Sequence, residues 1–183
     1  MSVTFITGNK HKAELLERYL GLDILHTKLD LDEIQSFDLH KISEHKARQA
    51  YKKIKKPVLV EDVALEFKAL GKLPGPYIKW FEQEIGLEDI CRLLDSFASR
   101  EAIAKVCFAY FDGKNLKFFD GQMAGKITPE PKGTGFGWNP IFISQGSDKT
   151  FAELYDEDKA HFSLRATTVF PQIKKFLSSL DIK

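Results

Sequence analysis

Cysteine is scarce in this sequence, and its scarcity removes two kinds of site. The only cysteines, Cys91 and Cys107, are spaced neither as a CxxC redox pair nor as the ligands of a zinc knuckle. Both lie in apolar stretches, and free cysteine is among the most frequently buried residue types. We therefore expect two buried thiols, as in a protein of the reducing cytoplasm.

A large charge of either sign and a long apolar run are also absent. The 27 basic and 26 acidic residues leave a net charge of +1, which gives no reason to expect a nucleic acid as a partner. No segment approaches the roughly 18 apolar residues that a membrane span needs. The first strand-like run starts at Val3, which leaves no room for a signal peptide. These absences predict a cytoplasmic protein with no membrane partner.

What is present is an ordinary globular composition. Hydrophobic residues make up 43% and charged residues 29% of the 183 positions, a length that suits one domain with a sizeable core. No internal repeat, low-complexity tract or linker divides the chain. We therefore expect residues 1–183 to form a single domain.

Strand-like and helix-like patterns alternate along the chain. Runs of β-branched and aromatic residues predict strands over 2–7, 58–60, 102–111 and 116–127, with a weaker strand signal over 22–31. Apolar residues at helical spacing predict helices over 11–20, from Asp38 into the basic run 52–56, and over 78–81, 87–97 and 164–180. Residues 112–115 carry a hairpin signal, 129–137 have the composition of a loop, and Pro171 would kink or break the last helix. This order argues for an α/β fold with a mixed sheet.

The first candidate site is the turn Thr7-Gly8-Asn9, which joins the first strand to the first helix. Backbone N–H groups at a helix start have no partner within the helix and favour an anion, and Gly8 lets a ligand approach the backbone closely. Lys12 lies one helical turn further on and could reach back to a phosphate. The alternative is a capped helix with solvated lysines, because the turn lacks the full spacing of a P-loop.

A second candidate site consists of acidic residues. Glu61 and Asp62 end the predicted strand 58–60, and carboxylates at the end of a buried strand face the crevice where open α/β sheets bind ligands. Glu33 is a further candidate ligand from another loop, and Mg²⁺ favours one or two carboxylates together with water and phosphate oxygens. The alternative for each acid is a solvated surface position.

The last two candidate sites lie in the C-terminal half. Residues 135–140 place two aromatic side chains in a glycine-containing loop, which could form a platform for a nucleobase or fold back over the core. Further on, Lys159 precedes Ser163 and Arg165, and an arginine fork can bind O6 and N7 of a 6-oxo purine together. The alternative for Arg165 is an exposed helix residue.

These segments, in this order, resemble the inosine triphosphate pyrophosphatase family, also called the non-canonical purine nucleoside triphosphate pyrophosphatases. The family's T-G-N turn, with a lysine three residues later, is matched by residues 7–9 and Lys12. Its V-E-D segment is matched by residues 60–62, and its L-P-G-P-Y-I-K-W-F stretch by residues 73–81. The resemblance continues to about residue 180.

The resemblance weakens at three positions. Asn139 stands where the family's F-G-[WY]-D-P-x-F loop has aspartate, and Leu164 stands where its closing S-H-R has histidine. Val63 replaces the threonine that usually follows V-E-D. The first two changes lie in the segments assigned to the base, and Leu164 removes an imidazole donor, so we expect the chemistry to survive while base preference is weakened or redirected. His161 is a neighbour that could compensate.

The fold that the resemblance implies is an elongated mixed β-sheet flanked by helices, with two lobes and a central substrate cleft, assembled as a homodimer. The implied reaction is the hydrolysis of deaminated purine nucleotides such as ITP, dITP and XTP, in which water attacks the α-phosphate and pyrophosphate leaves. One alternative is the same reaction on another modified or standard nucleotide. Another is a nucleotide-binding protein without activity.

The resemblance also implies the roles of individual residues. The triphosphate would be bound by Thr7, Gly8, Asn9 and Lys12, with positive charge added by Lys79. Glu33 and Asp62 would hold Mg²⁺, and Asp62 or Glu61 would activate the attacking water. The base would be contacted by Phe136, Gly137, Trp138, Asn139, Lys159, Ser163 and Arg165. This interpretation requires Lys12 and Asp62 to belong to one site.

Overall fold

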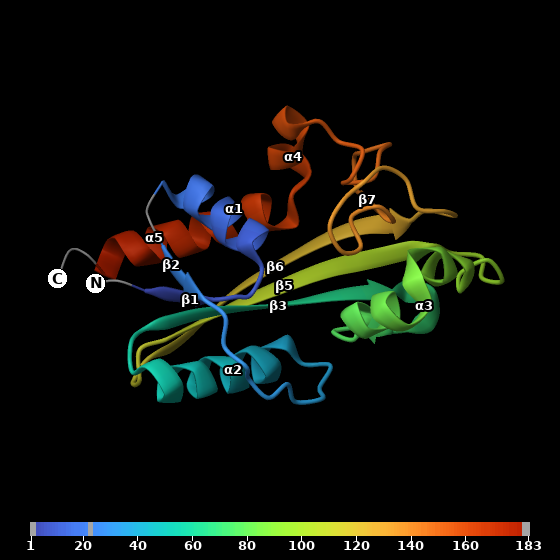
Figure 1. Ribbon diagram of the computed structural model, residues 1–183. Coiled ribbons are helices and arrows are strands. Elements are labelled where there is room, and N and C mark those ends of the chain that lie inside the picture. The colour runs from blue at the N-terminus through green and yellow to red at the C-terminus, as the bar shows by residue number, and fades with distance from the viewer. Residues whose placement is uncertain (1–2, 22–23, 181–183) are drawn as a thin grey trace. The chain divides into compact units, whose positions relative to one another are not determined.

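The computed structural model of the protein describes residues 3–21 and 24–180 (Figure 1). Its strands are β1 (Thr4–Ile6), β2 (Leu25–Thr27), β3 (Val58–Phe67), β4 (Pro74–Gly75), β5 (Glu101–Phe111), β6 (Leu116–Ile127) and β7 (Phe142–Ser144). Its α-helices are α1 (Lys10–Leu20), α2 (Leu39–Ile54), α3 (Ile78–Arg92), α4 (Asp156–Phe162) and α5 (Phe170–Leu180). A 3-10 turn covers Lys68–Leu70, and a π-helical turn covers Arg165–Val169.

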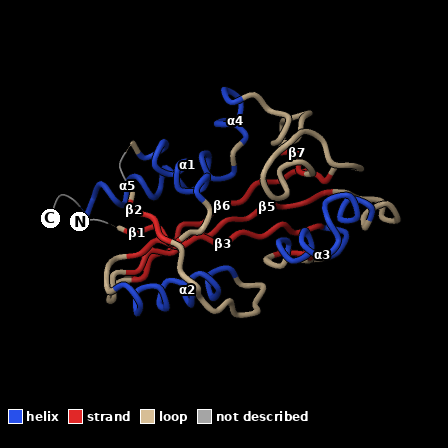
Figure 2. The backbone as a smooth tube through the Cα atoms, in the orientation of Figure 1, coloured by secondary structure: helices blue, strands red, loops and turns tan. Residues whose placement is uncertain are grey.

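The described strands form one seven-stranded sheet with helices packed around it (Figure 2). The strand order is β2-β1-β3-β5-β6-β7, with β4 paired to β3. The pairs β1–β2 and β1–β3 are parallel, whereas β3–β4 and β6–β7 are antiparallel. The prediction of an α/β fold with a mixed sheet is therefore confirmed.

The chain folds into two compact units that share the three long strands. Unit 1 comprises Met1–Asp62, Val106–Gly121 and Thr168–Lys183, and unit 2 comprises Val63–Lys105 and Gln122–Thr167. Each of the strands β3, β5 and β6 contributes residues to both units. The boundary on β3 falls between Asp62 and Val63.

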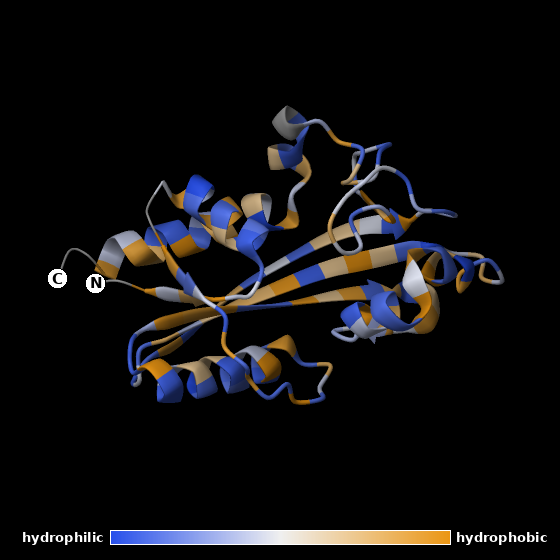
Figure 3. Ribbon diagram, in the orientation of Figure 1, coloured by the Kyte–Doolittle hydropathy of each residue, from blue (hydrophilic) through white to orange (hydrophobic). Residues whose placement is uncertain are grey.

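The sheet of unit 1 has a packed core on each face. On one face α2 contributes small residues, and the cluster that they complete consists of Ala47, Ala50, Val58, Val60, Ala109 and Phe111. On the other face, the ring of Phe108 packs against Phe5 and Phe170, and Tyr19 of α1 packs against Phe170. Figure 3 shows hydrophobic residues concentrated along the strands and alternating with hydrophilic ones along α2. Even and odd positions of β3 therefore face different helices.

A partly buried arginine connects two elements at one end of unit 2. The Arg100 guanidinium donates hydrogen bonds to the carbonyl oxygens of Cys91 (2.7 Å), Ile127 (2.9 Å) and Thr128 (2.6 Å). These bonds tie the end of α3 to the end of β6. Helix α3 itself is kinked at Gly86, whose backbone has φ 75° and ψ 169°.

Most of the predicted elements are present, and the hairpin at 112–115 is confirmed. The N–H of Asp112 donates to the carbonyl of Asn115, while its carboxylate accepts from the N–H groups of Lys114 and Asn115. Gly113 has φ 97°, and a Cβ there would lie 2.3 Å from the hydroxyl of Tyr51, so the turn requires glycine. The first strand and α1 match their predicted ranges closely, although position 2 and positions 22–23 of the predicted strands lie outside the described residues.

Several elements differ from the predicted secondary structure. The strand predicted over 58–60 continues to Phe67, so Glu61 and Asp62 lie within it and not at its end. The predicted segments 78–81 and 87–97 correspond to the two parts of α3, which is kinked between them at Gly86, but the second part ends at Arg92 and not at residue 97. Strand β7 and helix α4 are elements that the sequence patterns did not predict. The helix predicted over 164–180 is π-helical up to Val169, just before Pro171, as expected for a break there.

Two predictions from composition can be compared with the structure. Cys91 and Cys107 are both buried and free, as expected. Among the described helices, none combines the length and the apolar character needed to cross a membrane.

Candidate active site

The turn after β1 is a capped helix start. The Thr7 hydroxyl oxygen accepts from the N–H of Asn9 (3.1 Å), and the Asn9 side-chain oxygen accepts from the N–H of Lys12 (3.3 Å). Asn9 is thus the N-cap of α1. A Cβ on Gly8 would lie 3.0 Å from the side chain of Lys28, so the stem of that lysine covers the glycine. The capped-helix alternative is correct for Thr7 and Asn9 in the absence of a ligand.

Lys12 is not a fully solvated lysine, in contrast to the alternative interpretation of this turn. Its ammonium lies 3.1 Å from a carboxylate oxygen of Glu61, whose side chain is only 3% exposed. Glu61 is on β3, and its contact with Lys12 of α1 directs its side chain toward that helix. The phosphate-loop lysine and one of the predicted acids therefore form a largely buried ion pair within unit 1.

Asp62 takes part in a second ion pair, with a lysine that the sequence patterns did not single out. The ammonium of Lys46, on α2, lies 2.5 Å from Asp62 and 3.0 Å from Glu33. The side chains of Lys46 and Asp62 are 16% and 14% exposed. The two predicted metal ligands thus converge on one cationic group.

The electrostatics of this cluster follow from its burial. Burial has the largest influence on the pKa of the Asp62 carboxyl and raises it. The positive charges of Lys46 and Lys12 lower this pKa, whereas the negative charge of Glu33 raises it further. Burial tends to lower the pKa of Lys46, but the charges of Asp62 and Glu33 and the hydrogen bonds to them outweigh it, so this pKa is raised. Lys46 therefore remains charged. The charge of Lys12 is the smallest of these influences on Asp62, and that Lys12 and Asp62 share one site stays a prediction.

These five residues bring groups of both charges together. The ammonium groups of Lys12 and Lys46 face the carboxylates of Glu33, Glu61 and Asp62. Carboxylate oxygens are suitable ligands for a hard divalent cation, and ammonium groups suit phosphate oxygens.

A sequence signal for Lys46 did exist. Ile42, Ser43, Ala47 and Ala50 form the buried face of α2, and Lys46 lies at the spacing of that face. A lysine on the buried side of an amphipathic helix needs a charged partner. That requirement could have pointed to Asp62 or Glu33.

Unit 2 contains a pocket with a largely aromatic and aliphatic wall. The residues that line it are Met123, Trp138, Asn139, Phe142, Ser144, Phe151, Phe162, Ser163, Leu164 and Arg165. Of the residues that were predicted to contact the base, Trp138, Asn139, Ser163 and Arg165 are in this wall. Such a lining, with a few polar groups among apolar ones, suits a flat heterocyclic ligand.

The two aromatic residues of the 135–140 loop behave differently. Trp138 folds back, with its ring edge-to-face against Phe142 at 5.4 Å between centroids, as in the alternative that placed the loop over the core. Phe136 is 60% exposed, as a stacking platform would be, and does not line the pocket. The sharp turn between them has Gly137 at φ 59°.

Three other predicted contacts are described but do not line this pocket. Gly137 lies in the loop beside it, and Lys159 is on α4, which Ser163 ends as its C-cap. Lys79 is exposed on α3, with its ammonium 5.7 Å from the centroid of the Trp80 ring. Lys159 thus lies on α4 and not at the start of the last helix, whereas Ser163 lies where the last helical stretch begins, and its hydroxyl accepts from the N–H of Ala166.

Leu164 and Asn139, where the sequence departs from the family pattern, both line the pocket. Leu164 is almost completely buried there, so it contributes an apolar surface to the wall. The neighbouring His161 is exposed on α4 and is not part of the wall. In the described geometry, His161 does not replace the imidazole that Leu164 removes.

Comparisons with known proteins identify the family of the chain. Residues 3–174 match the sequence profile of the Ham1 family. The chain belongs to the Ham1 family. Inosine triphosphate pyrophosphatase 2 of Trypanosoma cruzi is 44% identical over 169 residues, which are 90% of this chain and 86% of the relative. Inosine triphosphate pyrophosphatase of Schizosaccharomyces pombe is 37% identical over 182 residues, 97% of this chain and 96% of the relative.

Solved structures of Ham1 proteins share the fold. The Ham1 protein of Staphylococcus aureus superposes with a TM-score of 0.83 at 24% identity, covering 98% of this chain and 99% of the other. A HAM1 protein from Coxiella burnetii gives a TM-score of 0.84 at 22% identity, with the same coverage. The expected membership of the inosine triphosphate pyrophosphatase family is thus confirmed, and so is the α/β fold.

Proposed function

We propose that this Ham1 family member is a nucleoside triphosphate pyrophosphatase that hydrolyses deaminated purine nucleotides, namely ITP, dITP and XTP, to the monophosphate and pyrophosphate. The observation that carries the proposal is the similarity to inosine triphosphate pyrophosphatases, at 37% to 44% identity over nearly the whole length of both chains. The alternative of an inactive nucleotide-binding protein is set aside, because these relatives are named as enzymes.

Unit 1 is the part that we assign to the triphosphate. Thr7, Gly8, Asn9 and Lys12 would bind it at the start of α1, where the helix dipole and backbone N–H groups favour an anion. Lys79, which belongs to unit 2, is a further predicted phosphate contact. Lys12 acts in catalysis by stabilising the negative charge that grows in the transition state.

Glu33 and Asp62 are the residues that we assign to a divalent metal. In support, their carboxylates already converge on one cation, the ammonium of Lys46, at 3.0 and 2.5 Å. All-oxygen ligands suit Mg²⁺. When bound, Mg²⁺ would neutralise charge on the phosphates as the bond to the leaving pyrophosphate breaks. Lys46 would then exchange its carboxylate partners for a phosphate oxygen.

The water that attacks the α-phosphate needs a base or an orienting acceptor. Glu61 is nearly inaccessible and is paired with Lys12, which suits a residue that positions the lysine. Asp62 is the more accessible of the two, with 14% of its side chain exposed against 3% for Glu61, so an attacking water can reach it more easily. We therefore assign the activation of water to Asp62 and a positioning role to Glu61.

The base would be recognised by unit 2. Arg165, Ser163 and Asn139 supply hydrogen-bonding groups in an otherwise apolar wall, while Phe136 and Trp138 supply aromatic surfaces. Gly137 and Lys159 complete the set of proposed contacts. One domain of residues 1–183 would thus combine both functions, with the chemistry in unit 1 and the selection of the base in unit 2.

A second candidate keeps the reaction but changes the nucleotide. It is favoured by Leu164, which presents an aliphatic side chain in the pocket wall where the family pattern has histidine. A pocket that lacks this donor would discriminate less against nucleotides whose base has no 6-oxo group.

Product analysis tests the reaction. The protein is incubated with ITP, XTP, GTP or ATP, with Mg²⁺ or with EDTA, and the corresponding nucleoside monophosphate, pyrophosphate and orthophosphate are quantified. We expect equal amounts of monophosphate and pyrophosphate, formed only when a divalent ion is present. Orthophosphate as the first product, or undiminished turnover in EDTA, would contradict the proposed chemistry.

Substitution of Leu164 distinguishes the two candidates for the nucleotide. In Leu164→His the ratio of kcat/KM for ITP to that for ATP should rise, because the imidazole restores a donor for a 6-oxo group. The matched control is His161→Leu, which changes an exposed neighbour and should leave the ratio unchanged. A ratio that is the same in all three proteins would show that position 164 does not select the base.

Two further features remain predictions. The homodimer rests on the family resemblance, and sedimentation of the purified protein would test it. The cytoplasmic location rests on the composition and on the two free thiols. Fractionation of cells would test that location.

A further inference from the structure

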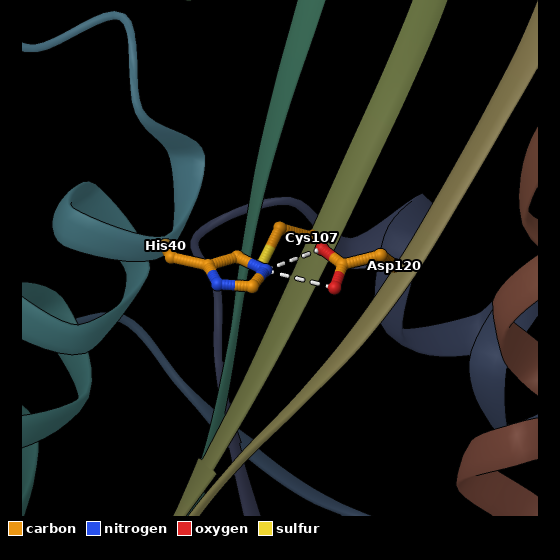
Figure 4. Close-up of side chains that lie close together, drawn as sticks. All are labelled: His40, Cys107 and Asp120. Carbon is orange, nitrogen blue, oxygen red and sulfur yellow. Dashed lines mark hydrogen bonds and ion pairs between the residues drawn. The ribbon is translucent and has the colours of Figure 1, made fainter.

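A second group of metal-ligating side chains lies in unit 1 and plays no part in the proposed hydrolysis. It consists of His40 on α2, Cys107 on β5 and Asp120 on β6 (Figure 4). One ligand atom from each residue lies within 4.8 Å of the other two. The Nε2 atom of His40 is 2.9 and 2.8 Å from the two carboxylate oxygens of Asp120. Figure 4 shows the imidazole and the carboxylate directed at each other, with the thiol beside them.

The backbone around these side chains is fixed independently of them. Asp38, the N-cap of α2, accepts from the N–H of His40 at 2.9 Å. The His40 ring is stacked on Phe118, with 4.1 Å between centroids and 7° between planes. Gln172 donates to the backbone carbonyl of Asp120 at 3.1 Å. The three ligands are thus presented by rigid elements, as a metal site requires.

The surroundings of the thiol also suit a metal ligand. Cys107 is fully buried, whereas His40 and Asp120 are about half exposed, so the group is closed on one side and open to water on the other. The hydroxyl of Ser43 lies beside the thiol. Within the described residues this fully buried hydroxyl makes no other hydrogen bond, so it is available to donate to a thiolate.

We propose that His40, Cys107 and Asp120 form a binding site for a thiophilic divalent ion, Zn²⁺, with water as the fourth ligand. In a tetrahedral zinc site with bonds of about 2.0 to 2.3 Å, ligand atoms lie roughly 3.3 to 3.8 Å apart. The His40–Asp120 distance would have to open slightly and the thiol to draw nearer. Small rotations of the two half-exposed side chains achieve this.

The ligand set separates this site from the one assigned to Mg²⁺. Imidazole and thiolate are preferred by Zn²⁺ and Co²⁺, whereas Mg²⁺ requires oxygen ligands. The bound ion would link the start of α2 to β5 and β6. The inference does not depend on the pyrophosphatase activity, and each can fail without the other.

Cobalt spectroscopy on the full-length protein tests the site. Co²⁺ is added to the protein in the presence of excess Mg²⁺, and the thiolate-to-cobalt charge-transfer band in the near ultraviolet is recorded. Zn²⁺ is then added to displace the bound Co²⁺. We expect about one Zn²⁺ per chain to abolish the band. The band should be lost in Cys107→Ser and retained in Cys91→Ser, which removes the other cysteine of the chain.

Because Cys107→Ser changes a buried residue and could prevent folding, two further variants replace the accessible ligands. His40→Asn and Asp120→Asn should each weaken Zn²⁺ binding by about tenfold or more. His26→Asn, at an exposed histidine on β2, should leave the affinity unchanged, with circular dichroism confirming the fold of every variant. The proposal is overturned if the wild type shows no charge-transfer band or if the band survives Cys107→Ser. It is equally overturned if both ligand variants bind Zn²⁺ as the wild type does; His40 and Asp120 would then form an ion pair only.

Discussion

Replacement of Lys46 by methionine isolates the role of the ammonium between the two proposed metal ligands. Methionine keeps most of the apolar stem but leaves Asp62 and Glu33 without the cation that both contact. Removal of one partner of a fully buried ion pair costs 3–5 kcal/mol; because Glu33 is half exposed and partly screened by water, we expect about 3 kcal/mol. For a chain of this size that loss lowers the melting temperature by roughly 6 to 12 °C.

A divalent ion should reverse this loss. Mg²⁺ at 100 times its Kd stabilises a protein by about 2.7 kcal/mol. In the wild type the ion competes with Lys46 for the two carboxylates, so its stabilising effect is smaller. Thermal unfolding of both proteins, with Mg²⁺ and with EDTA, therefore should show a larger Mg²⁺-dependent shift in Lys46→Met. The turnover of Lys46→Met should nevertheless fall, because the ammonium group that we assign to a contact with the phosphates is missing.

The control for this experiment is Lys52→Met, which removes an exposed lysine from the same helix. It should melt as the wild type does, with or without the ion. The reasoning is refuted if Lys46→Met is as stable as the wild type in EDTA. It is also refuted if Mg²⁺ shifts the two melting temperatures equally, since the carboxylates would then not be the ligands.

Three further predictions concern other parts of the molecule. Lys12→Met should lower kcat/KM for ITP by about 10²- to 10³-fold in the pyrophosphate-release assay, and an undiminished value would remove Lys12 from the proposed contacts. Burial raises the pKa of Cys107 to about 12, and Cys91 is also buried, so in the metal-free folded protein neither thiol should react rapidly with a disulfide reagent until the protein is unfolded. Arg100→Lys should lower the free energy of unfolding by about 2–3 kcal/mol in denaturant titrations, because most of three hydrogen bonds to carbonyls are lost. Arg92→Lys, at an exposed ion pair, is the matched control and should change stability little.

Local patterns in the sequence predicted the parts of the fold that depend on local interactions. The hairpin at 112–115 and the start of α2 at Asp38 follow from side chains that bond to nearby backbone groups. The full length of β3 could not be predicted in this way. Beyond Glu61 and Asp62 its stability comes from neighbouring strands, and the two charges interrupt the apolar pattern that marks a strand.

Four members of the candidate site were predictable from the sequence, but their pairing and the fifth member, Lys46, were not. The resemblance to the family pointed to Lys12, Glu33, Glu61 and Asp62, and the structure adds which acid contacts which lysine. Lys46 was missed because its partners are distant in the sequence: Asp62 is 16 residues away along the chain. The same limit applies to Phe142 and Phe162, which line the unit 2 pocket from elements that the patterns did not predict.

The position of two adjacent acids inside a strand has a consequence for how this segment can change. Because consecutive side chains leave β3 on opposite faces, Glu61 meets Lys12 of α1 and Asp62 meets Lys46 of α2. Deletion of one residue between Val58 and Glu61 would reverse the parity, so that each carboxylate would point at the other helix. A change of length by one residue in this stretch should therefore disturb both ion pairs, whatever the hydrophobicity of the residue gained or lost.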